Sequence, residues 1–98
     1  MLDELTTSVR ELVEGKEAVG FDVKFDLGNS GIIFVSGTTA PMQVSNEDVP
    51  ADTVFKVSAE DLSAMLQKTL APMMAYMQGK LKVDGDLSQA MQLSSIFS

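Results

Sequence analysis

Apolar residues recur along this chain with two periods, one typical of amphipathic helices and one typical of half-buried strands. From Leu2 to Val13 they return every three or four positions, and Gly15 follows where a helix would stop. This pattern predicts a helix over 3–14. Over 21–27, apolar and charged residues alternate strictly, which predicts a strand.

Turn signals and a proline divide the middle of the chain into three further strands. The GNSG sequence at 28–31 predicts a tight connection into the apolar run IIFVSG, so the strands on either side should pair as a hairpin. Pro41 limits the next strand, around 42–45, to a strand start or an edge. A further turn precedes a fourth strand over 53–58.

Three helices and one strand are predicted in the remainder of the chain. Ser58 and Asp61 have the spacing of a capping box, which predicts a helix start at Ser58. Pro72 suits the first turn of another helix, which Gly79 ends. That helix is apolar nearly all round, so it should be covered on more than one side. A fifth strand over 80–85 leads to Asp86, which with Gln89 repeats the capping pattern and opens the last helix.

The order α-β-β-β-β-α-α-β-α predicts an α+β fold with a five-stranded, mainly antiparallel (mixed) sheet. Because the strand faces alternate between polar and apolar, we expect helices to cover one face only. The interior then lies between the sheet and the helices. At 98 residues, the whole of 1–98 is expected to form a single domain with a modest core.

Charge and missing residue types exclude several function classes. The formal charge is -7, and the seven bases are scattered among fourteen acids, so we expect no nucleic-acid binding. The same charge argues against resting on an anionic lipid surface. Without cysteine the chain has no thiolate nucleophile, and without histidine it lacks the commonest general base and transition-metal ligand. We therefore expect no catalytic residue, no metal, no cofactor and no enzyme activity.

The ends of the chain and its apolar runs bear on location. No apolar run approaches the ~20 residues needed to span a bilayer. Asp3 and Glu4 occupy the N-terminus, where a secretory signal would carry positive charge. We expect a cytoplasmic protein without stable membrane insertion.

Methionine is concentrated in the C-terminal part of the chain, where five of the seven fall between positions 65 and 91. A single methionine is ordinarily core filling, but this density specifies packing poorly and suits a wall that must accept varied shapes. A lipid-sized pocket of at least ~300 Å³, left empty, would cost ~7 kcal/mol at ~24 cal/mol per Å³. Such a pocket should either stay occupied or let flexible side chains collapse into it.

The segment AYMQGKLKVDGDLSQAMQLSSIF, 75–97, resembles the C-terminal signature of the sterol carrier protein type two family, also called non-specific lipid-transfer proteins. ADTVFKVSAEDLSAML (51–66) and FDLGNSGIIFVSG (25–37) resemble its strand-to-helix segment and its early hairpin. The resemblance implies a five-stranded sheet with helices on one face and an apolar cavity for fatty acyl chains, sterols or similar lipids.

By position, the resemblance implies that Met73, Met74 and Met77 form part of the cavity wall. It places Gln78 as a polar group near the cavity, and Met91 with the last helix at the opening.

Three features depart from the family pattern. Gln67 precedes Lys68 where members carry Gly-Lys, so that turn should differ. The final SIFS lacks a peroxisomal Ser-Lys-Leu ending or a longer tail, so peroxisomal targeting is not indicated and the cavity should be less covered there. The acidic net charge is unlike the basic eukaryotic carriers and argues against membrane-docked transfer.

Together these patterns predict non-catalytic binding, and as a further step transfer, of a fatty acid, acyl chain or sterol-like lipid. The predicted ligand-binding residues are Phe34, Phe55, Leu62, Met65, Leu66, Met73, Met74, Met77, Gln78, Leu81, Met91 and Phe97. Gln78 or Tyr76 would meet the head group. The alternative is a structural or interaction module, or an accessory subunit, whose apolar groove is filled by a partner helix or a second copy. The sequence is compatible with a monomer and with a homodimer.

Overall fold

The computed structural model describes residues 1–97, with side chains up to Leu93, and its elements follow the predicted order. The first half contains α1 (Leu2–Val13), β1 (Val23–Asp26), the 3₁₀ turn η1 (Gly28–Ser30), β2 (Ile32–Ser36) and β3 (Gln43–Ser45). The second half contains β4 (Thr53–Val57), α2 (Ala59–Leu66), α3 (Pro72–Met77), β5 (Leu81–Gly85) and α4 (Leu87–Phe97). The predicted element order is confirmed, with boundaries shifted by only one or two residues.

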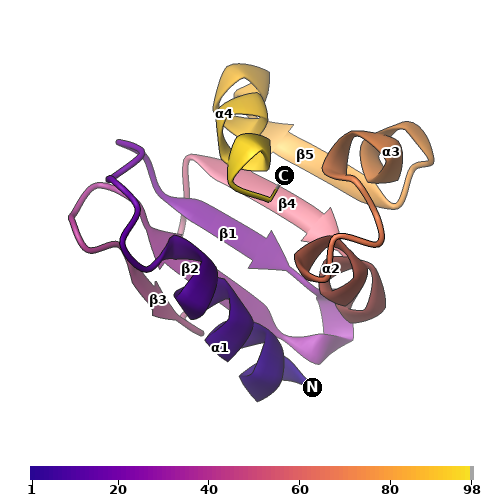
Figure 1. The fold of residues 1–98 in the computed structure, drawn as a ribbon, viewed down its shortest axis with the longest axis horizontal. Helices are drawn as coiled ribbons and strands as arrows, with labels where there is room; N and C mark the ends of the chain where they lie inside the picture. Colours follow the sequence, from indigo (N-terminus) through magenta and orange to yellow (C-terminus); the bar gives the residue numbers. More distant parts are fainter. Residues whose placement is uncertain (98) are drawn as a thin grey trace.

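The five strands form one sheet in the order β3-β2-β1-β4-β5. Three neighbouring pairs are antiparallel, and only β1 and β4 run parallel, so the predicted mixed, mainly antiparallel sheet is confirmed. All four helices lie on the same face of this sheet (Figure 1). The fold is therefore α+β with one interior, as the alternating strand patterns predicted.

The connection from β3 to β4 must cross from the edge of the sheet to the far side of β1. Lys24, in the middle of β1, shows the path, because its Nζ lies 2.9 Å from Oδ1 of Asp48 in that connection. The neighbours of Lys24 along the strand, Val23 and Phe25, are buried on the helix side, so Lys24 projects from the opposite face. The connection consequently covers part of the sheet face that carries no helix.

The core consists of the side chains that the strands direct toward the helices. Register places these positions side by side, since Phe25 pairs with Ile33 of β2 and with Phe55 of β4. The buried strand residues on this face are Val23, Phe25, Ile33, Val35, Thr53, Phe55, Val57 and Leu81. Helix α1 packs Leu5, Val9 and Val13 against them, as its apolar spacing predicted.

Both predicted helix caps form, although one differs in detail. The Ser58 hydroxyl accepts the Asp61 N–H at 3.1 Å and starts α2. The Asp86 carboxylate accepts the Ser88 N–H at 2.7 Å and starts α4. Gln89 does not complete a capping box, because its Oε1 accepts a 2.6 Å hydrogen bond from the hydroxyl of the fully buried Thr53. That bond fastens α4 to β4.

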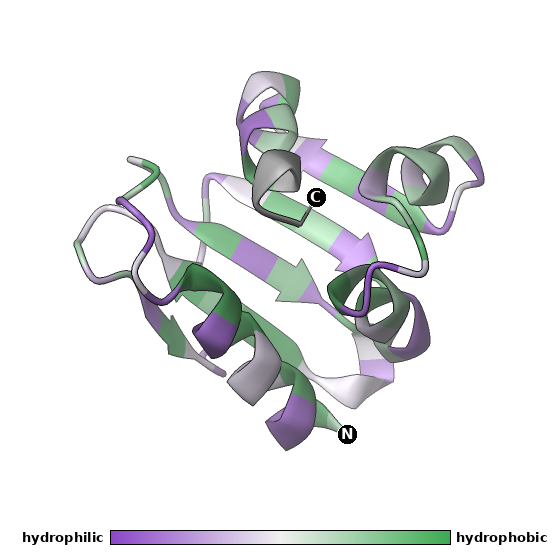
Figure 2. Ribbon diagram, in the orientation of Figure 1, coloured by the Kyte–Doolittle hydropathy of each residue, from purple (hydrophilic) through white to green (hydrophobic). Residues whose placement is uncertain are grey.

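Helix α3 departs from the sequence prediction that it is covered on several sides. Only Ala75 is buried, while Met73, Met74, Tyr76 and Met77 are between 46% and 74% exposed. The reason is geometric: α3 is a six-residue helix at the edge of the sheet, and it contacts β5 and α4 from one side. Figure 2 shows it as a largely hydrophobic element at the periphery.

The turn after α2 contains the one backbone position in residues 1–97 where a non-glycine residue has a positive φ, Lys68 at 64°. This conformation costs about 1–2 kcal/mol in a residue with a Cβ. We expect Lys68→Gly to raise the free energy of unfolding by about 0.5–1 kcal/mol, after the greater entropy loss of glycine is subtracted. Urea denaturation measures the change. Lys68→Ala is the control; an equal gain in that variant would show that removal of the lysine side chain, not backbone strain, is responsible.

Candidate functional site

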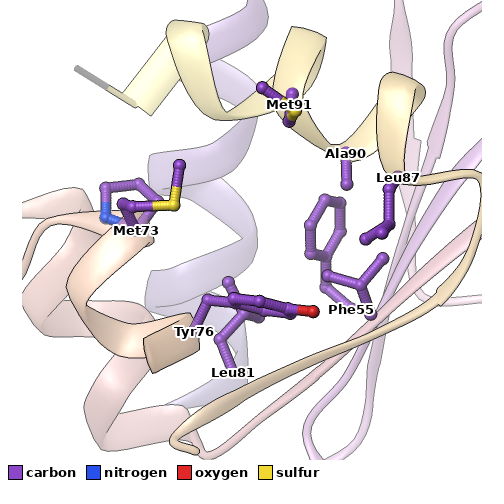
Figure 3. A pocket seen from close by; sticks show the side chains of 9 residues that line it. Phe55, Met73, Tyr76, Leu81, Leu87, Ala90 and Met91 are labelled. Carbon is purple, nitrogen blue, oxygen red and sulfur yellow. The ribbon is translucent and has the colours of Figure 1, made fainter. Parts of the chain in front are cut away.

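An apolar cavity of about 160 Å³ lies between the β4–β5 edge of the sheet and helices α3 and α4 (Figure 3). The residues that line it share one property, since all carry hydrocarbon, aromatic or thioether side chains. They are Phe55, Pro72, Met73, Tyr76, Leu81, Val83, Leu87, Ala90 and Met91. The Tyr76 hydroxyl is the only polar side-chain group among them. The site can therefore hold an apolar molecule and offers little to a polar one.

The floor of the cavity is set by strand register. Phe55 pairs with Val83, and Leu81 lies two residues away on the same face of β5. The ring of Phe55 stacks on that of Phe25 with centroids 5.4 Å apart and an interplanar angle of 18°. Because Phe25 is itself buried, the stack holds the floor in place.

The rim is formed by side chains from α3 and α4 that are largely exposed. Met73 and Met91 are 56% and 63% exposed, and Leu87 and Tyr76 are also about half exposed. From α4, Ala90 points toward the Phe55 ring (Figure 3). Methionine has three rotatable side-chain bonds and adapts to irregular shapes. The cavity thus combines a fixed floor with an adjustable mouth.

The cavity volume limits what fits without movement. A cavity of ~150 Å³ holds a molecule the size of benzene, whereas sites for drug-sized ligands begin near ~300 Å³. The observed 160 Å³ is about half the size expected from the sequence. At ~24 cal/mol per Å³, leaving it empty costs at most ~4 kcal/mol.

The structure brings together four of the residues predicted for the ligand site. Phe55 and Leu81 lie on the floor, and Met73 and Met91 lie on the rim. Tyr76, named as a head-group partner, lines the same space. Sequence reasoning missed Pro72, Val83, Leu87 and Ala90. Two simple signals could have identified most of them. Val83 shares a strand face with Leu81, and Leu87 and Ala90 lie on the part of the last helix that carries Met91.

Several predicted site residues lie away from the cavity. Leu62 and Met65 are fully buried core residues of α2. Leu66 is half-buried and faces a shallow depression beside α1. Met74 and Met77 of α3 and Gln78 at its C-cap are exposed and are not among the lining residues. Phe97 belongs to the part of α4 whose side chains lie outside the described residues.

Phe34 requires a correction, because it was expected between the sheet and the helices. Its strand neighbours Ile33 and Val35 are buried on the helix side, so Phe34 projects from the opposite face. Its cross-strand partner on β1 is Lys24, whose side chain forms the ion pair with Asp48 on that face. The sequence IIFV is apolar throughout, so it did not reveal which residues point inward.

Two further properties concern the described residues only. Within residues 1–97, no three acidic side chains are grouped closely enough to hold a metal ion. No helix in this range has the length and apolarity that crossing a membrane requires.

Comparison with known proteins gives a consistent result. The family model described as "SCP-2 sterol transfer family" matches residues 5–98. Stomatin-like protein 1 of Mus musculus is 38% identical over 79 residues, which cover 78% of this chain and 20% of that protein. The chain thus spans about one fifth of the length of the first curated relatives it matches.

Two solved structures of similar fold are of proteins from Aedes aegypti. The crystal structure of Sterol Carrier Protein 2 Like 2 superposes with a TM-score of 0.76 at 22% identity, covering 96% of this chain and 94% of that one. The solution structure of Sterol Carrier Protein-2 in complex with the C16 fatty acid palmitate gives a TM-score of 0.78 at 17% identity, with 98% and 93% covered. At these identities the likeness concerns the fold alone.

Proposed function

The chain belongs to the SCP-2 sterol transfer family, and we propose that it binds a fatty acyl chain or a similar apolar ligand in the cavity between β4, β5, α3 and α4. The observation that carries the proposal is a cavity whose lining is apolar except for the Tyr76 hydroxyl and whose mouth is exposed to solvent. The palmitate complex of a protein with the same fold supports the choice of ligand class. Transfer of the ligand to an acceptor is a further step of the same proposal.

Binding would be driven by removing the ligand's methylene groups from water. Each buried CH₂ contributes about 0.8 kcal/mol, so micromolar affinity, about 8 kcal/mol, requires about ten of them. A cavity of about 160 Å³ does not hold that length of chain as it stands. Met73 and Met91 would swing outward and extend the apolar wall along the ligand. The carboxylate would stay at the mouth, within reach of the Tyr76 hydroxyl.

Palmitate should stabilise the folded protein, because a ligand that binds only the folded state raises the free energy of unfolding. At a free concentration of 100 times the dissociation constant the gain is about 2.7 kcal/mol, which for a domain of this size raises Tm by about 10 °C or more. Thermal unfolding with and without palmitate measures this. The chain has one tyrosine and no tryptophan, so intrinsic fluorescence reports on Tyr76 at the cavity itself.

Butyrate is the matched control, since it presents the same carboxylate with too short a chain to fill the cavity. We expect neither a Tm shift nor a change in Tyr76 emission with butyrate. A protein that ignores palmitate in both measurements would contradict the proposal. If light scattering then showed a dimer, the alternative in which a second copy fills the groove would take its place.

A further inference from the structure

The two edges of the sheet differ in how their outward backbone groups are satisfied. At one edge β3 has only three residues, and the carbonyl oxygen of its middle residue, Val44, accepts a 3.3 Å hydrogen bond from Nη2 of Arg10 on α1. At the other edge β5 has five residues, and within the described part of the chain no hydrogen bond reaches the outer side of its backbone. An edge strand with open N–H and C=O groups is a template for another strand.

Register determines which residues of β5 present those groups. The Thr53 N–H donates to the Asp22 carbonyl at 3.3 Å, so the backbone of Thr53 and of every second residue after it faces β1. The residues between them face β5 and bond there to positions 82 and 84. The other three residues of β5 therefore turn their N–H and C=O groups to the open edge. They are Leu81, Val83 and Gly85.

On the sheet face that carries no helix, β5 bears opposite charges two positions apart. Lys82 and Asp84 are exposed on that face, because Leu81 is buried and Val83 half-buried on the helix side. A lysine on an edge strand ordinarily keeps other strands away. It attracts a strand that places an acid opposite it, and the sequence Lys-Val-Asp at 82–84 does so for a second copy that runs in the reverse direction.

We propose that two copies of the chain pair antiparallel through β5, about a two-fold axis that passes between the two Val83 residues. Val83 and its copy then form a hydrogen-bonded pair, and Leu81 pairs with Gly85 of the second copy, so the outward backbone groups are satisfied. Lys82 lies opposite Asp84 of the second copy in the closer, non-hydrogen-bonded pairing, and the symmetry repeats this contact. The two five-stranded sheets become one continuous sheet.

Charge selects this register over its neighbours. The two nearest registers that keep the same backbone hydrogen bonds centre the axis on Lys82 or on Asp84. Each of them sets a residue opposite its own copy and so places like charges together, which destabilises a strand pair. Only the axis at Val83 pairs each lysine with an acid.

The helix side of the same edge supplies an independent argument. Seven large apolar side chains are exposed among the described residues, and six of them belong to α3 and α4. Helix α3 lies beside the start of β5 and α4 beside its end (Figure 1), so the two-fold axis sets α3 of one copy opposite α4 of the other. Association then covers apolar surface that a single copy leaves in water. The six residues are Met73, Met74, Tyr76, Met77, Leu87 and Met91.

The pairing does not rest on the proposed function, although four of these six side chains also border the cavity. The second copy would extend the apolar wall of each mouth and leave the cavity itself free. This separates the pairing from an arrangement in which a second copy fills the cavity.

Charge-swap variants test the pairing by sedimentation equilibrium at ~0.15 M salt, where a Debye length of ~8 Å screens the net charge of -7 on each copy. We expect a dimer for the unaltered chain. Lys82→Asp sets acid opposite acid at both symmetric contacts, and Asp84→Lys sets lysine opposite lysine, so each should weaken association ~10-fold or more. Both positions are exposed, and Lys82→Asp also removes the like-charge pair with Lys56, so the single copy should stay folded.

Mixing the two variants is the decisive step, because each then meets a partner of opposite charge. We expect a heterodimer of one Lys82→Asp copy and one Asp84→Lys copy, with affinity restored to that of the unaltered chain, and native mass spectrometry resolves it by mass. Lys16→Asp is the control, since it makes the same charge change at an exposed position beyond the C-terminus of α1 and should leave the dimer intact.

Three results would overturn the pairing. They are a chain that stays monomeric up to millimolar concentration, a dimer that both charge swaps leave intact or that Lys16→Asp weakens as much as Lys82→Asp, and folded swap variants that do not associate when mixed. Failure of the pairing and failure of the cavity are distinguishable. A monomer with a palmitate-dependent Tm shift disproves the pairing alone, and a dimer that the swaps dissociate but palmitate does not stabilise disproves the cavity function alone.

Discussion

Replacing Phe55 with alanine is expected to lower the free energy of unfolding by about 3–5 kcal/mol, the range for removing a buried aromatic ring. Phe55 is 4% exposed, stacks on Phe25 and lies on a central strand of the sheet. For a chain of this length the whole free energy of unfolding is of order 5–15 kcal/mol, so this loss is a large part of it. Because Phe55 also forms the cavity floor, the variant should gain a larger cavity that is continuous with the mouth.

An apolar ligand should therefore restore more stability to Phe55→Ala than it adds to the unaltered protein. Phe25→Ala is the matched control, because it removes the other ring of the same stack. Phe25 is 2% exposed but does not line the cavity, so its removal leaves a closed void that the ligand cannot reach. Urea unfolding of the three proteins with and without palmitate measures the difference. Equal restoration of both variants would show that palmitate does not occupy the space above Phe55.

The architecture was predictable from the sequence because each local signal agreed with the global fold. Alternation over 21–27 established which side of β1 faces the core, and the side chains of Ser58 and Asp86 cap helices as predicted. The pairing of β1 with β4 was not predictable in this way. A parallel pair between strands separated by a long connection leaves no turn motif, and the ion pair of Lys24 with Asp48 that marks the crossover is not a local pattern.

The candidate site was predictable only in part, because residue type does not determine direction. Methionine density indicated the right region, yet Met65 is core while Met73 and Met91 form the rim. In the uniformly apolar run IIFV, only register shows that Phe34 points away from the helices. Helix α3 was misread for a related reason: its sequence is that of a covered helix, but its position at the sheet edge leaves it exposed.

Filling the cavity by Ala90→Phe is expected to weaken palmitate binding at least ~100-fold while the fold persists. Ala90 is 6% exposed on α4 and lines the cavity opposite Phe55, so an added ring would take the space that the ligand needs. Filling the void returns part of its ~4 kcal/mol cost, whereas overpacking costs ~1–3 kcal/mol, so stability should stay level or rise.

Ala18→Phe is the control for this variant, since it adds the same ring at an exposed position between α1 and β1. We expect the control to keep both the palmitate-dependent Tm shift and the Tyr76 fluorescence change, and Ala90→Phe to lose both. A folded Ala90→Phe protein that still binds palmitate with unchanged affinity would move the ligand site away from the cavity. Because the ring leaves the Tyr76 hydroxyl in place, loss of binding would also show that contacts at the mouth do not hold the ligand unless its acyl chain enters the cavity.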